Sequence, residues 1–149
     1  MNAKKIAMLL TIGACLLGLP AIGSLKNPVT RPWKSVIYQT LVITLDASGI
    51  PVSWEVDGVA LSSHLGLSEN RGGGTFDEGG NPVGTGVTIA ANGDRIFWNG
   101  GLVTGGTGRF EGATGFAATV YMDTLFWPDP PPGTVVADVV LITEGTITY

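Results

Sequence analysis

The sequence predicts an all-β protein. Runs rich in Val, Ile, Tyr and Thr are separated by turn signals such as Asn92-Gly93 and Gly79-Gly80-Asn81-Pro82, and no stretch after residue 23 shows the period of a helix. Glycine is abundant, at 23 of 149 residues, and a hydrophobic fraction of 44% is too high for a disordered chain. Seven or eight short strands of this kind form either a barrel or a sandwich.

Residues 1–23 have the pattern of an export signal. Two lysines precede an uncharged apolar stretch over residues 6–22, and Ala21-Ile22-Gly23 has small residues at the two positions that a signal peptidase reads. We therefore predict cleavage before Ser24, one domain over residues 24–149 and a periplasmic or extracellular protein. A retained membrane anchor is the alternative, although the apolar stretch is slightly short for a span.

The only cysteine, Cys15, lies within this segment, so no intrachain disulfide is expected. It weakly matches a lipobox, which makes a lipoprotein a minor alternative. Residues 24–149 contain 6 basic and 12 acidic residues, a net charge of −6, and the basic residues are scattered. This pattern disfavours nucleic-acid binding and attraction to an anionic membrane surface.

The first half of the domain is expected to contain one long strand and several short ones. After a polar lead-in over 24–32, the segment 35–46 is a strand with apolar residues on both faces, which indicates cover on both sides or an oligomer interface. The segments that follow are a strand over 52–56, a turn at Asp57-Gly58, a strand over 59–67, a loop over 68–74 and a brief strand over 75–77.

The second half begins with a hairpin of residues 84–91 and 95–103, in which Asn92-Gly93 supplies the positive φ angles of a type I′ turn. A strand over 116–127 places Phe116, Ala118, Val120 and Met122 on one face and Ala117, Thr119, Tyr121 and Asp123 on the other. An exposed proline-rich loop over 128–133 precedes a last strand over 134–149 that is interrupted near Gly145.

The run from Val103 to Gly115 contains five glycines in thirteen residues, which suits a β-chain that turns sharply. Its Gly-Gly-Thr-Gly-x-Phe core resembles a signature of the allene oxide cyclase and dirigent families, which are small antiparallel β-barrels. With Ser63-His64-Leu65-Gly66 and Ala90-Ala91-Asn92-Gly93-Asp94, it is similar to a group of exported bacterial proteins of unknown role. The resemblance implies a barrel of about eight strands and, because those families are commonly trimers, a homo-oligomer.

Ionisable candidates for catalysis are few. His64 is the only histidine, and Glu55 lies on a predicted strand beside Trp54. Either would act as a general acid or base only if burial shifted its pKa, and a solvated carboxylate and a hydrogen-bonding histidine are the simpler interpretations. The chain has no Gly-x-Ser-x-Gly elbow, no glycine loop leading into a helix and no EF-hand spacing. We therefore expect no metal site and no cofactor.

Aromatic residues outnumber these candidates. An eight-stranded barrel is the size at which side chains either fill the interior or enclose one small ligand. The leading prediction is an exported barrel that binds a small apolar ligand in its lumen, lined by aromatic side chains that include Trp54, Phe97, Trp98 and Tyr121.

Three other functions remain open. The resemblance implies an isomerase or cyclase of the allene oxide cyclase or dirigent type, acting on an apolar substrate. A filled barrel would instead indicate a structural or surface protein. The terminal Ile147-Thr148-Tyr149 is similar to the closing strand of an outer-membrane barrel, but the strands predicted at 52–56 and 75–77 are too short to span, so no stable membrane insertion is expected.

Overall fold

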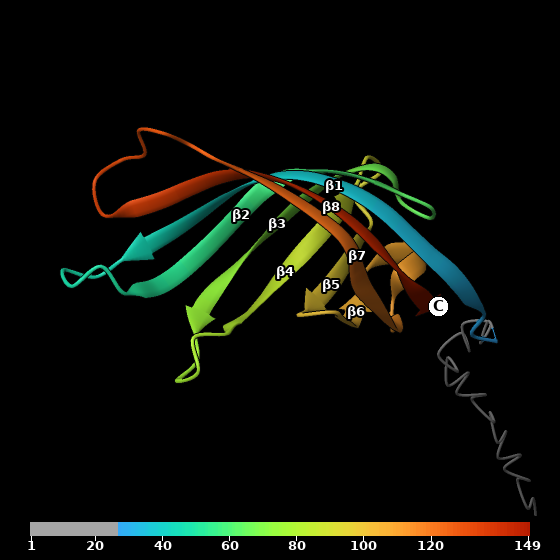
Figure 1. The fold of residues 1–149 in the computed structure, drawn as a ribbon. Coiled ribbons are helices and arrows are strands. Elements are labelled where there is room, and N and C mark those ends of the chain that lie inside the picture. The colour runs from blue at the N-terminus through green and yellow to red at the C-terminus, as the bar shows by residue number, and fades with distance from the viewer. Residues whose placement is uncertain (1–26) are drawn as a thin grey trace, which may run out of the picture.

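The computed structural model describes residues 27–149, so the predicted export signal and Cys15 lie outside the described residues. Eight antiparallel strands pair in chain order and β8 closes on β1, which confirms the predicted all-β barrel (Figure 1). The elements are β1 (Thr30–Leu45), β2 (Pro51–Ser62), β3 (Gly66–Phe76), β4 (Pro82–Ala90), β5 (Arg95–Asn99), β6 (Leu102–Gly106), the 3₁₀ turn η1 (Gly108–Phe110), β7 (Thr114–Phe126) and β8 (Thr134–Thr148).

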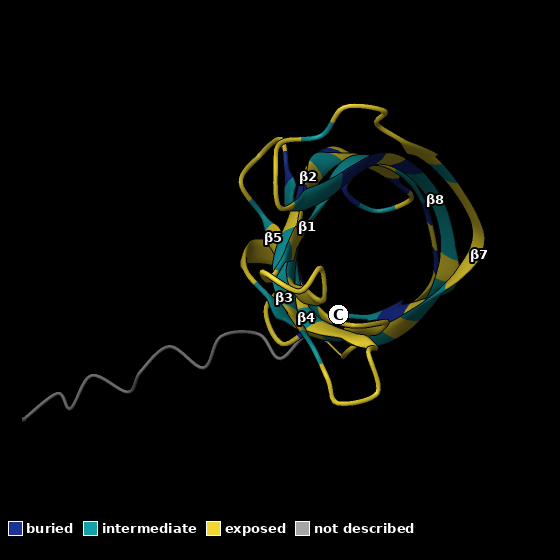
Figure 2. Ribbon diagram, turned by 60° about the vertical axis from the view of Figure 1, so that its left-hand side comes forward, coloured by how far each residue is buried: buried dark blue, intermediate teal, exposed yellow. Residues whose placement is uncertain are grey.

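The wall of the barrel is uneven in height. β1 and β8 pair along fifteen residues of each strand. By contrast, β5 and β6 have five residues each, and β6 pairs with β7 only at Leu102–Phe116 and Val103–Gly115. The strands are arranged as a ring, as the view in Figure 2 shows, but the β5–β6 side of this ring is much shorter than the β8–β1 side.

One end of the barrel is closed by a packed core. Its members are fully or almost fully buried and come from strand ends and turns: Trp33, Leu65, Ala90, Ile96, Phe110, Ala113 and Ile147. Phe110 of η1 has no exposed surface, and its ring packs edge-on against Tyr149 with centroids 4.8 Å apart. The glycine-rich run therefore folds back across this end as a plug, after β6 and before β7.

The turn predicted at Asp57-Gly58 is wrong, because β2 runs unbroken from Pro51 to Ser62. Gly58 lies in the middle of the strand and pairs with Gln39 of β1 and with Asn70 of β3. A Cβ atom at Gly58 would lie 2.5 Å from the Cα atom of Gln39. The glycine therefore permits a close approach inside the barrel and does not make a turn.

The loop predicted over 68–74 is also wrong, because these residues belong to β3 and pair with β2 and β4. The triplet Gly72-Gly73-Gly74 indicated a loop, but it lies within a strand whose neighbours occupy the space that its side chains would need. β2 and β3 thus have 12 and 11 residues, which is long enough to span a membrane, but β5 and β6 have five residues each and are too short. β8 is likewise continuous through Gly145, where an interruption was expected.

The hairpin predicted over 84–103 does turn near Asn92-Gly93, but its turn type and its second strand differ from the prediction. Gly93 has a positive φ of 86°, whereas none of the non-glycine residues in 27–149 has one, so the turn is not of type I′, which needs positive φ at both central residues. The strand predicted over 95–103 is divided into β5 and β6 by a turn at Gly100-Gly101.

The strand predicted over 116–127 is confirmed as β7, but its two faces exchange halfway along. The register shifts between Thr119 and Tyr121, so Val120 is the extra residue of a β-bulge. Beyond the bulge Met122 pairs with Leu141, which lines the barrel interior, while Tyr121 pairs with Ile142 on the outside. The assignment of Tyr121 and Met122 to faces is therefore the reverse of the predicted one.

Candidate functional site

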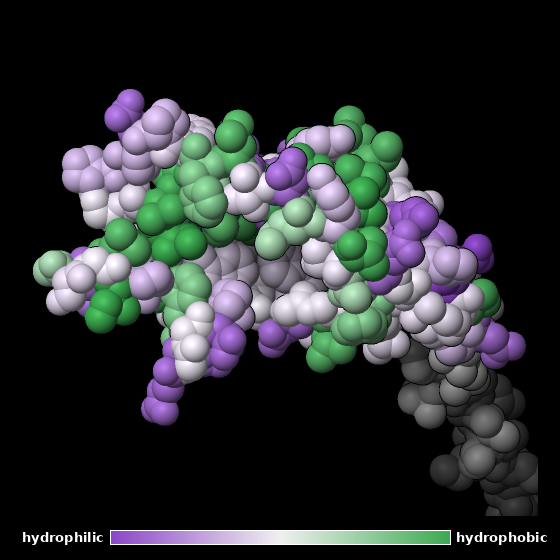
Figure 3. All heavy atoms as spheres, viewed as in Figure 1, coloured by the Kyte–Doolittle hydropathy of each residue, from purple (hydrophilic) through white to green (hydrophobic). Residues whose placement is uncertain are grey.

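The inward-facing side chains of the strands enclose a cavity of about 650 Å³ above the packed core. Apolar groups of β1 and β8, such as Ile37, Leu41 and Leu141, form one side of it. Trp54, Trp98 and Phe76 contribute aromatic surface on the other side. Figure 3 shows apolar side chains gathered around a hollow on the face where β4 to β7 lie. The interior is thus filled at one end and open at the other.

Glycines on β3 and β4 make room for the two indoles. A Cβ atom at Gly86 would lie 2.0 Å from Cζ2 of Trp98, and one at Gly72 would lie 2.3 Å from Cη2 of the same ring. A Cβ atom at Gly84 would lie 2.6 Å from Cζ2 of Trp54. These distances are far below van der Waals contact, so the ends of the two indole rings lie against a stretch of wall without side chains, formed by Gly72, Gly84 and Gly86 (the glycine wall).

Polar groups in the lumen form a short chain across three strands. The Thr88 hydroxyl donates to Oδ1 of Asn70 at 3.0 Å, and Nδ2 of Asn70 donates to Oε1 of Gln39 at 2.9 Å. Asn70 and Thr88 are buried, and Gln39 is half-buried and lines the cavity. Closer to the packed end, the Ser35 and Ser62 hydroxyls bond to each other at 2.7 Å.

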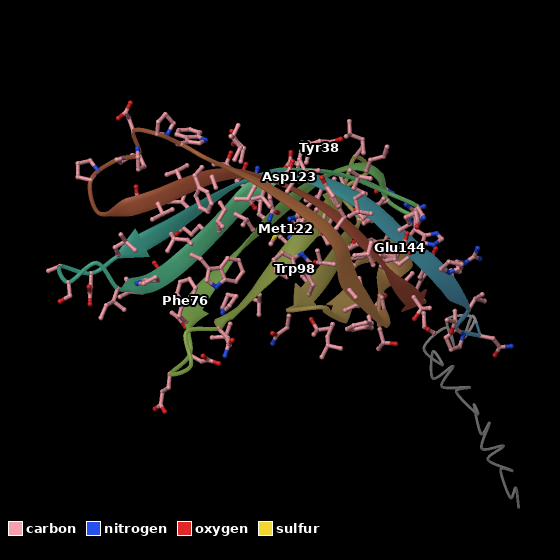
Figure 4. All side chains as sticks on the ribbon, viewed as in Figure 1. Tyr38, Phe76, Trp98, Met122, Asp123 and Glu144 are labelled. Carbon is pink, nitrogen blue, oxygen red and sulfur yellow. The ribbon has the colours of Figure 1, made fainter. Side chains whose placement is uncertain are left out.

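The cavity has a lateral notch beside its open end. One edge of this notch is β7, which pairs only with β8 from Ala118 onward. The other edge is the beginning of β4, which has no partner in β5 before Thr85 pairs with Asn99. The turn at Gly100-Gly101 borders the notch on the side of the packed end, and both glycines line the cavity. Met122 and Trp98, labelled in Figure 4, face the cavity from its two sides.

Of the four predicted aromatic residues, the structure brings two together in the lumen. Trp54 and Trp98 line the cavity, and the indole Nε1 of Trp54 donates to the Thr75 carbonyl oxygen at 3.2 Å. Phe97 and Tyr121 lie on the outer face and are 37% and 51% exposed. Phe97 is outside because it alternates with Trp98 along β5, and Tyr121 is outside because of the bulge at Val120.

Neither predicted ionisable candidate lies in the cavity. Glu55 is on the outer face of β2, opposite Val42 and Gly73. His64 lies in the β2–β3 turn at the packed end, where its Nε2 is 2.6 Å from the Pro32 carbonyl oxygen and its ring lies 5.9 Å from that of Tyr149. Among the described residues, no Asp, Glu, His, Lys or Arg side chain lines the cavity. The site therefore offers shape and uncharged hydrogen-bonding groups.

Sequence reasoning missed the polar chain and the glycine wall. One signal for the wall was present, because Gly72 and Gly74 alternate on one strand and Gly84 and Gly86 alternate on the next. Alternate glycines on paired strands mark one face of the sheet where something bulky lies. No comparable signal pointed to Gln39, whose importance depends on the glycine opposite to it.

A scan against protein-family models finds no match for this chain, and a search of curated proteins finds no similar sequence. Within residues 27–149, no group of three or more His, Cys, Asp and Glu side chains is placed to hold a metal ion. No helix in the same part of the chain is long and apolar enough to cross a membrane.

Proposed function

We propose that this protein is an exported β-barrel that binds a small apolar ligand non-covalently in its lumen. The observation that carries the proposal is the open cavity of about 650 Å³, which lies within the range of ligand sites and combines mostly apolar lining with a few polar groups. The glycine wall supports it, because Trp98 lies against Gly72 and Gly86 and Trp54 lies against Gly84, in space that side chains at these glycines would fill.

Binding is favoured over a reaction by the composition of the lining. A cyclase or isomerase that moves protons needs a group with a suitable pKa within reach of the substrate. The described lumen has only the amides and hydroxyls of residues such as Gln39, Asn70 and Thr88. The proposal therefore assigns the lumen no acid–base step. A relation to the allene oxide cyclase and dirigent families agrees with the eight-stranded fold, which by itself does not identify them.

Export is part of the proposal and rests on residues 1–23. The outer wall is consistent with an aqueous location, because charged groups interrupt it at mid-height. Arg71 pairs with Asp57 at 3.1 Å and with Glu69 at 2.9 Å on this face. A membrane barrel has a continuous apolar band there.

One row of apolar side chains does cross the outer face of five strands in register: Leu67, Leu61, Val36, Ile142 and Tyr121. This row is the face that we propose for homo-oligomer contacts.

Native mass spectrometry of the chain, purified without detergent from the periplasmic or secreted fraction of an expressing cell, tests the proposal. We expect extra mass that is lost on gentle activation. The Trp98→Leu variant should lose this mass, and the matched Phe97→Leu variant, altered at the adjacent outward position, should retain it. The same spectrum reports the N-terminus and the oligomeric state.

A titration with an added probe makes the test independent of the ligand in the cell. We expect 2-isopropylnaphthalene to shift the indole NMR signals of Trp54 and Trp98 and to leave that of Trp127, which lies outside the lumen, unchanged. An unliganded mass together with no indole shift would contradict ligand binding in the lumen and would favour a structural role.

A further inference from the structure

The arrangement of the polar chain indicates which kind of ligand the lumen selects. Gln39 is on β1 and Asn70 is on β3, two strands apart, yet their side-chain amides are bonded at 2.9 Å. The residue between them is Gly58 of β2, which pairs with both. Because Gly58 has no side chain, Gln39 can reach across β2 inside the barrel. A Cβ atom at Gly58 would lie 2.7 Å from that of Gln39.

The chain leaves one group free at the cavity. The Thr88 hydroxyl donates to Asn70, and Asn70 donates to Oε1 of Gln39. Nε2 of Gln39 then has two hydrogens, and no hydrogen bond within the described residues uses it as a donor. It is not among the fully buried atoms that lack a partner, so it is accessible to a ligand. An amide hydrogen-bonded through its oxygen is polarised toward stronger donation by its nitrogen. The free end of the chain is therefore a fixed donor in an apolar cavity.

The lumen also lacks any charge that would compensate an ionised ligand. None of the described residues that line it is ionisable. The basic groups adjacent in sequence to lining residues are Lys34, Arg71 and Arg95, and all three are exposed on the outer wall. Lys34 pairs there with Glu144, and Arg71 pairs with Asp57 and Glu69. A buried carboxylate without a counter-charge is strongly disfavoured, whereas a neutral oxygen needs only a donor.

We propose, as an extension of the ligand-binding function above, that the lumen selects an uncharged apolar molecule with one acceptor oxygen, and that Nε2 of Gln39 binds this oxygen. The ligand class is thus a neutral carbonyl, ether or alcohol on an apolar body, and not a fatty or aromatic acid. The apolar body lies against Trp98 and Met122 beside the notch, and the oxygen lies at Nε2 of Gln39, at the end of the chain formed with Asn70 and Thr88.

Three probes of nearly the same shape test this inference. They are 2-acetylnaphthalene, which has a neutral acceptor, 2-isopropylnaphthalene, which has none, and 2-naphthoate, which is ionised at pH 7. Calorimetry with the wild-type protein should rank the acetyl compound about fivefold tighter than the isopropyl compound, which is the usual value of one neutral hydrogen bond. The carboxylate should bind the weakest.

The variants Gln39→Leu and Gln39→Met should abolish the preference, so that the acetyl and isopropyl compounds bind about equally. The affinity for the isopropyl compound should stay almost unchanged. Two substitutions are used so that a folding defect in one, detected by thermal unfolding, does not decide the test. Ile37→Val is the matched control, because residue 37 lines the same side of the cavity one step deeper and has no polar group. It should preserve the preference.

The outcomes separate the inference from the function on which it rests. Failure of all three probes to bind the wild-type protein contradicts ligand binding itself. Equal binding of the acetyl and isopropyl compounds, or an acetyl preference that survives in both Gln39 variants, overturns the role of Gln39 and leaves ligand binding intact. Tightest binding of the carboxylate overturns the selection for neutral ligands.

Discussion

The two ends of this barrel are built from the same strands in opposite ways. At the packed end, Phe110 and Ile147 have no exposed surface, and the glycines of the run before β7 bring the chain across the opening. At the open end, the glycines lie inside strands and make room for Trp54 and Trp98. The comparison teaches that glycine closes the barrel at one end and leaves room for bulky side chains at the other. The packed core and the proposed binding cavity therefore lie at different ends.

The largest expected effect is on the stability of the packed end. Phe110→Ala should lower the free energy of unfolding by about 3–5 kcal/mol, because it leaves a cavity in the core. Phe76→Ala, at the mouth of the lumen, should cost about 1 kcal/mol or less, because Phe76 is only partly buried. Urea denaturation measures both. Equal losses would show that the two ends share one core.

The glycine wall offers a comparison between two adjacent residues. Gly72→Ala should cost about 1–3 kcal/mol, because its Cβ atom would collide with the Trp98 ring. Gly73→Ala, on the opposite face of β3, should cost less than half as much, because its nearest neighbour would be at 3.0 Å. The same denaturation experiment should show a smaller cost of Gly72→Ala in a Trp98→Leu background. An unchanged cost would mean that Gly72 does not serve the indole.

The smallest effect concerns the β3–β4 turn at the open end. The backbone N–H of Asn81 and its side-chain amide, with the N–H of Gly79, donate to the Asp77 carboxylate and hold its pKa below the usual 3.8. This contribution is fully present above the unfolded-state pKa and is lost as the pH falls through the lower pKa of the folded state.

The Asp77→Ala variant should therefore melt slightly below the wild type at pH 6, and the difference should shrink below pH 4. Asp129→Ala, in the exposed proline-rich loop, is the control and should show no difference at either pH. A difference for Asp77→Ala that grows on acidification would contradict the sign of this prediction.

The sequence predicted the fold class and most strand positions because period-two runs and turn residues report local conformation. The predictions failed at glycines, because a glycine can either form a turn or permit a close approach between strands. Gly58 was predicted to make a turn and Gly72-Gly73-Gly74 to belong to a loop, but Gly58 makes room for Gln39 and Gly72 makes room for Trp98, and both partners lie on other strands. No local pattern contains that information.

The site was half predictable for the same reason. Of the four aromatic residues predicted in the lumen, Trp54 and Trp98 do line the cavity, whereas Phe97 alternates with Trp98 along β5 and lies on the outer face. The β-bulge at Val120 then inverted the alternation, which moved Tyr121 outside and Met122 inside. A bulge adds one residue without any distinctive side chain, so composition did not reveal it. Glu55 was predicted from its neighbour Trp54, although adjacent residues of a strand face opposite sides.

The notch beside β7 has a consequence for self-association. A closed barrel has no strand edges, but β7 beyond Ala118 has a neighbour on only one side, which is the situation in which a strand from another molecule can add. The carboxylate of Asp123 already accepts from the Thr124 N–H at 2.9 Å. It thereby occupies an edge amide and places a negative charge beside it. Asp123 should therefore limit fibrillar aggregation, and its neutralisation should promote it.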